Sequence, residues 1–146
     1  MSKLFIYSSQ YGSGDVVASY LKDKGFEIRK VESTYKLSKV FFFAMMKGGY
    51  HAGINKVAKL VNYDNNVAKY DEIYIGSPIW NDRLTPITNA ILEETFLKDK
   101  KLTFILYSGG GQCKHAYKKL HSLYPEATII NLKQPKKYPE ELKKLD

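Results

Sequence analysis

Short apolar runs alternate along this chain with longer stretches of helical period, and this alternation limits the possible folds more than any other feature. The runs Lys3–Ser8, Glu72–Ser77 and Leu102–Ser108 are almost continuously apolar, as in strands that are covered on both faces. The stretches at about Asp15–Lys24 and Lys114–Leu123 place apolar residues on one side of a helix. This order predicts an α/β fold, a doubly wound open parallel sheet with helices on both faces.

Two further strands and a further helix complete the expected pattern. Phe26–Val31 and Ala127–Leu132 supply the strands, which makes the sheet five-stranded, and a helix is expected at about Thr85–Phe96. Pro139 opens a short helical segment at the end of the sequence. No repeat or linker interrupts the chain, so we expect a single domain over residues 1–146.

The segment from about Tyr35 to Asn66 does not follow this alternation. The sequence predicts a broken helix, with a helical part at Ile54–Val61 after a glycine-rich interruption. The apolar run Val40–Met46 either fills the core or forms a flap near a ligand. It is too short to cross a bilayer, which takes about 20 residues.

The composition limits the cellular compartment and the kinds of partner that we expect for this protein. One cysteine excludes an internal disulfide, and no signal peptide is recognisable at the start, so we expect a cytoplasmic protein without membrane attachment. The formal net charge of +8 favours an anionic partner, which could be an acidic protein, a nucleic acid, a membrane surface or a phosphorylated ligand, or it reflects lysines that only face water. We expect no nucleic-acid interface, because the basic residues are spread along the chain and no binding motif accompanies them.

Three expected strands end in similar segments of glycines, hydroxyl residues and exposed backbone. Because open α/β sheets bind ligands outside the carboxyl ends of their strands, these three loops are expected to form one site. We expect neither a metal site nor a catalytic acid or base. The expected binding residues are Ser9, Gln10, Tyr11, Gly12, Ser13 and Gly14 in the first loop, Ser77, Pro78, Ile79, Trp80 and Asn81 in the second, and Ser108, Gly109, Gly110 and Gly111 in the third.

The first loop leads into a helix start, where unpaired N–H groups and the helix dipole favour an anion. Gly12 and Gly14 permit backbone angles that gather N–H groups around one ligand atom, and Ser9 and Ser13 add hydroxyls. Neither a Walker lysine nor a three-glycine dinucleotide fingerprint is present. The loop is therefore either a phosphate site or an ordinary strand–helix turn.

The other two loops are equally open to two interpretations. Trp80 either covers a planar ligand or packs on a neighbouring helix. The run Gly109–Gly111 either permits close approach of a ligand to the backbone or forms a flexible turn. Cys113 follows this run, as a redox thiol or as a packed one.

Over nearly its whole length the sequence resembles the short-chain flavodoxins and flavodoxin-like proteins. Residues 9–14 (SQYGSG) match the first hydroxyl and the glycine of that family's phosphate loop, S/T-x-T-G-x-T, with Tyr11 and Gly14 in place of threonines. Residues 70–80 (YDEIYIGSPIW) resemble the stretch that leads to the loop flanking the isoalloxazine ring, and residues 108–111 resemble the third flavin loop.

The resemblance implies strand order 2-1-3-4-5 and a bound flavin mononucleotide (FMN). Its phosphate would sit at residues 9–14, and its ring would lie between the second and third loops with Trp80 against it. The implied function is electron transfer through FMN between redox partner proteins. Typical flavodoxins are acidic, so this basic chain would prefer acidic partners.

Two other functions are compatible with the same fold. An NAD(P)H-dependent quinone or flavin reductase would need a nicotinamide cleft beside the ring, which the aromatic segment 41–53 could form. A flavin-free binding module is the other possibility, because the first loop departs from the family pattern.

Overall fold

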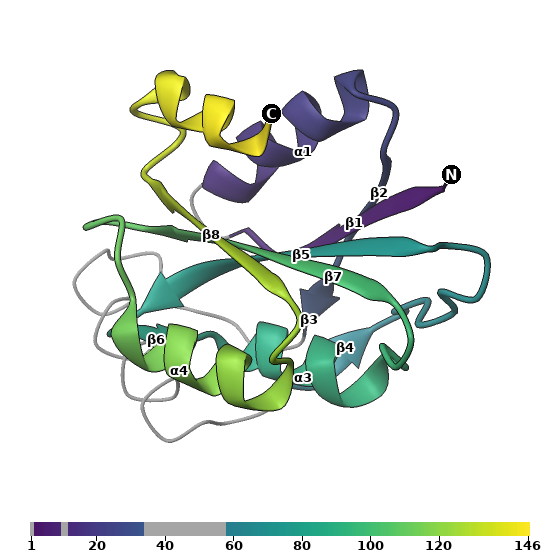
Figure 1. Ribbon diagram of the computed structural model, residues 1–146. Helices are drawn as coiled ribbons and strands as arrows, with labels where there is room; N and C mark the ends of the chain where they lie inside the picture. The colour runs from purple at the N-terminus through teal and green to yellow at the C-terminus, as the bar shows by residue number, and fades with distance from the viewer. Residues whose placement is uncertain (1, 10–11, 34–57) are drawn as a thin grey trace.

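A central sheet of five parallel strands organises the computed structural model, which describes residues 2–9, 12–33 and 58–146 (Figure 1). The order β2-β1-β5-β7-β8 is the predicted order 2-1-3-4-5, and each neighbouring pair is parallel. The strands are β1 (Lys3–Tyr7), β2 (Glu27–Lys30), β5 (Glu72–Trp80), β7 (Lys101–Ser108) and β8 (Thr128–Lys133).

Alternating side chains of the central strands enter two separate cores, one on each face of the sheet. Leu4 of β1 and Phe104 of β7 belong to one core, whereas Phe5 and Ile105 belong to the other. Both faces are therefore apolar, which explains why these strands read as continuous apolar runs.

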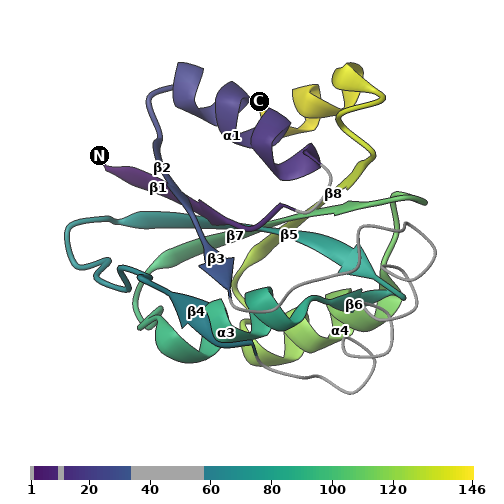
Figure 2. The same ribbon diagram turned by 180° about the vertical axis from the view of Figure 1, so that it is seen from behind.

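Helices cover both faces, as predicted (Figures 1 and 2). Helix α1 (Ser13–Asp23) and the C-terminal 3-10 helix η1 (Pro139–Leu145) lie on one face, and α3 (Pro86–Glu94) and α4 (Lys114–Leu123) lie on the other. Asp146 holds η1 beside α1 through an ion pair of 2.8 Å with Lys24. Among the described residues, no helix is long and apolar enough to cross a membrane.

Three short strands were missed by the sequence analysis. Strand β6 (Arg83–Leu84) pairs antiparallel with the end of β5, and β3 (Glu32–Ser33) pairs antiparallel with β4 (Leu60–Val61). The helix expected over Ile54–Val61 is thus wrong at its described end, because Leu60 and Val61 gain strand partners distant in sequence. The other expectations for residues 34–57 lie outside the described residues. They are the first part of the broken helix, the core or flap role of Val40–Met46, and the nicotinamide cleft at the aromatic segment 41–53.

Candidate functional site

The carboxyl ends of the central strands lie at one edge of the sheet, on the left in Figure 1. Tyr7 at the end of β1 is in register with Gly76 of β5, which is in register with Ile105 of β7. Ser108 at the end of β7 is in register with Lys133 at the end of β8. The three expected loops therefore leave neighbouring parallel strands on the same side of the sheet.

The first loop gathers two amides around one oxygen. Gly12 and Gly14 donate their N–H groups to Ser9 Oγ, at 3.2 and 3.1 Å. Gly12 is the N-cap of α1 and has a φ of 93°, a conformation that side chains with a Cβ rarely adopt. Ser13 is the first residue of the helix, so the loop feeds directly into its N-terminus. Gln10 and Tyr11 lie outside the described residues.

Gly14 is required by packing. A Cβ at this position would lie 2.6 Å from the Tyr107 hydroxyl, 2.8 Å from Cδ2 of Tyr7 and 2.9 Å from Cβ of Ser9. The Tyr107 hydroxyl donates to the Ser8 carbonyl, which fixes the ring under the loop. Burial raises the pKa of Tyr107 well above its ordinary value, so it stays a donor. The threonine of the family pattern therefore has no room at Gly14.

Asp15 carries the acidic charge in the first turn of α1. It accepts a hydrogen bond of 2.7 Å from the Tyr7 hydroxyl and forms an ion pair of 2.9 Å with Lys30. Partial burial alone would raise the pKa of Asp15. The bonds from Tyr7 and Lys30 and the charges of Lys30 and Lys136 outweigh burial and lower it. The loop therefore lies in a basic environment although one carboxylate is present.

The second loop is a tight hairpin turn rather than a long loop. Strand β5 continues through Pro78 and Ile79 to Trp80, which pairs with Arg83 of β6. Asn81 and Asp82 make the turn with φ angles of 51° and 62°. Two successive positive φ angles are typical of a type I′ turn, in which Asn and Asp are favoured.

Hydrogen bonds inside the protein hold this hairpin. Ser77 is fully buried and donates to the Pro78 carbonyl at 2.8 Å, while its oxygen accepts from Thr88 of α3. The Ser77 hydroxyl therefore supports the end of β5. Asp82 accepts bonds from the backbone N–H groups of Ala116 and His115, at 3.1 and 3.3 Å, and so connects the turn to the start of α4.

The edge of the hairpin is accessible. Pro78, Ile79 and Trp80 are half-buried, and Asn81 is exposed. Trp80 thus lies at the end of the buried strand. Whether it covers a planar ligand or packs on a neighbouring helix, the two possibilities that the sequence leaves open, stays a prediction.

The third loop contains glycines of two kinds. Gly111 has a φ of 77°, and a Cβ there would lie 3.1 Å from Cβ of Lys133. A Cβ on Gly110 would meet nothing within 4 Å, and on Gly109 only Nε2 of Gln134 at 4.0 Å. Neither has a positive φ. Among the described residues, neither backbone conformation nor packing requires glycine at 109 or 110.

The structure adds to the site a fourth segment, which the sequence analysis did not include. The turn after β8 connects the first and third loops: Gln134 Nε2 donates to the Gly109 carbonyl at 3.0 Å, and Lys136 lies against Gly12. Ser8 was missed as well. Its Oγ is the one buried side-chain nitrogen or oxygen without a hydrogen-bond partner in the described part of the chain. The turn after β8 could have been found from the sequence by its three lysines, Lys133, Lys136 and Lys137, which gather at the end of an expected strand.

Cys113 behaves as a packed thiol. It is buried, donates to Asn131 Oδ1 at 2.8 Å, and has its pKa raised by burial and by the nearby charge of Asp82 to about 11. Little thiolate exists at neutral pH, which argues against a redox role.

Comparison with solved structures identifies the same architecture elsewhere. A flavoprotein in complex with FMN from Lactobacillus acidophilus is 20% identical, covering 95% of this chain and 97% of that chain, with a TM-score of 0.63. A proposed flavoprotein from Bacteroides eggerthii is 21% identical, covering 88% of this chain and 84% of that chain, with a TM-score of 0.75. At these identities the likeness shows the fold. The comparison with curated proteins gives no match.

A protein-family comparison goes further than the fold. The family model described as flavodoxin matches residues 54–144, more than half of the chain. The matched part contains the second and third loops and the turn after β8, whereas the first loop precedes it. This chain therefore belongs to the flavodoxin family.

Proposed function

We propose that this protein binds FMN at the carboxyl edge of its sheet and carries electrons as a single domain. The observation that carries the proposal is the convergence of three loops from three adjacent parallel strands, β1, β5 and β7, in a flavodoxin family member. Two features of these loops fit the cofactor: amides gathered at a helix start, and glycines that face open space. A similar fold is known in complex with FMN, which supports this choice of cofactor.

The first loop is suited to the phosphate. Its amides at Gly12 and Gly14 and the start of α1 offer donors to an anion, with the hydroxyls of Ser9 and Ser13 beside them. The Ser9 hydroxyl now accepts from both amides, so it would share or yield them when phosphate binds. Gln10 and Tyr11 complete the proposed phosphate loop.

The other two loops are suited to the ring. Trp80 would lie against one face, where aromatic contact adds about 0.5–1.5 kcal/mol beyond area burial. Backbone groups of Asn81 and of Gly109–Gly111 would approach the ring edge, while Ser77, Pro78 and Ile79 hold the hairpin that positions Trp80. FMN supplies the redox chemistry when bound. The chain's own residues bind it, orient it and exclude water.

The charge of the chain suggests the kind of partner. A net charge of +8 attracts acidic proteins and accelerates their encounter. We propose acidic redox partners in the cytoplasm, where a single cysteine remains reduced.

An absorption spectrum tests the proposal. The purified protein is measured before and after FMN is added and the sample desalted. Retained flavin bands support the cofactor. A colourless protein after desalting would overturn it in favour of a flavin-free binding module. Rapid bleaching of bound FMN by NADPH alone would identify a reductase instead of a carrier.

A further inference from the structure

The turn after β8 has a defined backbone that places Lys136 over the first loop. Gln134 donates its N–H to the Ser108 carbonyl at 3.0 Å, and its own carbonyl accepts from Lys137 and Tyr138, each at 2.9 Å. Pro135 is buried, so the turn is packed onto the body of the protein. The backbone of Lys136 therefore belongs to an ordered turn of the fold and not to a loose chain end.

The side chain of Lys136 lies along the first loop. A Cβ built on Gly12 would lie 3.2 Å from its Nζ, 3.3 Å from its Cδ and 3.5 Å from its Cε. Gly12 is also one of the two residues whose amides converge on Ser9 Oγ. One ammonium group and two amide donors therefore surround the same short stretch of backbone.

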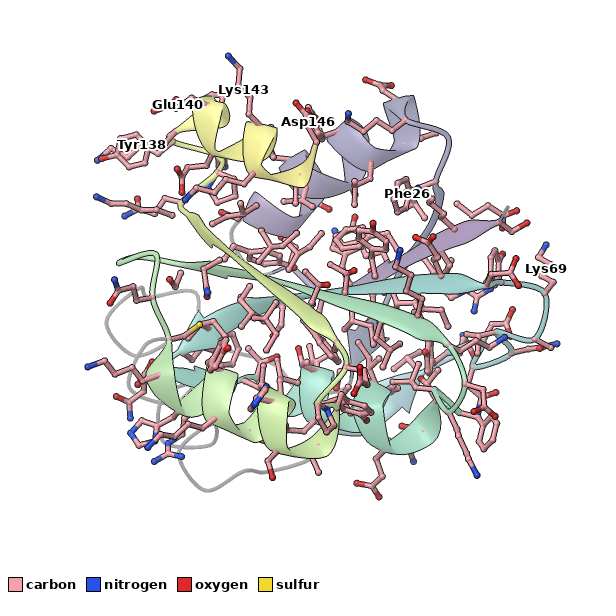
Figure 3. All side chains as sticks on the ribbon, viewed as in Figure 1. Phe26, Lys69, Tyr138, Glu140, Lys143 and Asp146 are labelled. Atoms are coloured by element: carbon pink, nitrogen blue, oxygen red, sulfur yellow. The ribbon has the colours of Figure 1, made fainter. Side chains whose placement is uncertain are left out.

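The neighbouring lysines lie elsewhere. Lys133 and Lys137 each place their Nζ 5.4 Å from the ring centroid of Tyr138, which Figure 3 shows at the same end of the molecule as the strand carboxyl ends, away from Lys69. Asp15, the carboxylate nearest in sequence to the loop, forms its ion pair with Lys30 at 2.9 Å, and the charge of Lys136 also helps to lower the pKa of Asp15. Among these basic residues, Lys136 is the one in contact with Gly12.

The loop has no hydroxyl at position 14, where the phosphate loop it resembles has a threonine, because a side chain has no room there. A phosphate monoester carries about −1.5 to −2 charge at neutral pH. A charge-assisted hydrogen bond is about twice as strong as a neutral one, so a single ammonium can compensate for the hydroxyl missing at position 14. Directly before the loop, the Ser8 Oγ is buried without a hydrogen-bond partner among the described residues.

We propose that Lys136 is a phosphate-binding residue, whose ammonium contacts the phosphate of the cofactor and makes the site prefer phosphorylated FMN over riboflavin. This inference rests on the proposed FMN site. It adds to that site a cationic ligand from outside the first loop.

The test compares Lys136→Gln with the matched control Lys137→Gln, which removes the same charge one residue away. Dissociation constants of FMN and riboflavin are measured by flavin fluorescence on apoprotein. Lys136→Gln should weaken FMN binding at least about tenfold and leave riboflavin binding unchanged, since a hydrogen bond between two charged groups is lost only for the phosphorylated flavin. Lys137→Gln should change FMN binding less than twofold, and Lys136→Arg should restore most of it. Equal weakening of FMN and riboflavin, or equal effects of the two glutamine variants, would overturn the proposal.

A second readout separates this inference from the cofactor proposal. Inorganic phosphate is compared with chloride at equal ionic strength, and the thermal midpoint of each apoprotein is measured. Phosphate should stabilise the wild type and the Lys137→Gln variant but not Lys136→Gln. This pattern in a protein that binds no flavin would support Lys136 and refute FMN. A phosphate effect that persists in Lys136→Gln would refute Lys136 whether or not FMN binds.

Discussion

The first and third loops, at the carboxyl ends of β1 and β7, both contain glycines, but the surroundings of these glycines differ. Gly12 has a positive φ, and Gly14 is enclosed by two tyrosine rings and a serine. Gly109 and Gly110 have neither constraint, and a Cβ on Gly110 would enter open space. The first loop therefore needs both glycines for its own fold. The third loop needs glycine for its fold only at Gly111, which has a φ of 77°, and has Gly109 and Gly110 where an external molecule is expected. Substitutions should show which glycines are needed for the fold of the loop and which leave room for a ligand.

The largest effect is expected for Gly14→Val. The new side chain would overlap Tyr107 and Tyr7, which are held beneath the loop, and overpacking of this kind costs about 1–3 kcal/mol. Urea unfolding of the apoprotein should show this loss, together with loss of FMN binding. Unchanged stability would mean that the tyrosine rings move aside and that packing does not explain this glycine.

Gly12→Val should act mainly on the ligand. A β-branched residue at a φ of 93° is strained, so the loop would change shape and its amides would turn away from the phosphate. We expect FMN affinity to fall at least about tenfold, with riboflavin affinity less affected. Titration of the apoprotein with both flavins measures this, and full FMN affinity would refute the placement of the phosphate.

Gly110→Val is the matched substitution in the third loop. The apoprotein should keep its free energy of unfolding within about 0.5 kcal/mol, because surface changes rarely cost more. FMN affinity should still fall about tenfold if the ring edge approaches this backbone closely. A variant with normal stability and normal FMN affinity would show that the third loop is only a flexible turn.

Trp80→Ala tests the hairpin between these loops. Loss of an aromatic contact of about 0.5–1.5 kcal/mol should weaken FMN binding by roughly two- to tenfold. The lower of the two reduction potentials should rise, since the aromatic face disfavours the negatively charged reduced flavin. Spectroelectrochemistry measures that potential, and an unchanged value would remove Trp80 from the ring face.

The smallest effect is expected for chemical modification of Cys113, which follows the third loop. With its pKa raised to about 11, the thiol is protonated at pH 8 and becomes a thiolate only as the pH approaches that value. Alkylation by iodoacetamide should therefore be slow at pH 8 and accelerate above pH 10, compared with the urea-unfolded protein by mass spectrometry. Rapid alkylation of the folded protein at pH 8 would reopen a redox role.

The sequence alone determined the five parallel strands, the covering helices and the three strand ends that form the candidate site. Local periodicity carries this information, because a strand buried on both faces must be apolar throughout and a helix on its surface must be apolar on one side. The flavodoxin resemblance was readable for the same reason, since its motifs are continuous in sequence.

Only the tertiary structure decided the roles of individual side chains within the site. Ser77 is buried against Thr88, and Gly14 is enclosed by Tyr7 and Tyr107. Lys136 lies beside Gly12, although the two residues are 124 positions apart in the sequence. Strands β3 and β4 likewise depend on pairing partners distant in the chain. Contacts of this kind arise where strands far apart in sequence end side by side, and no local pattern encodes them.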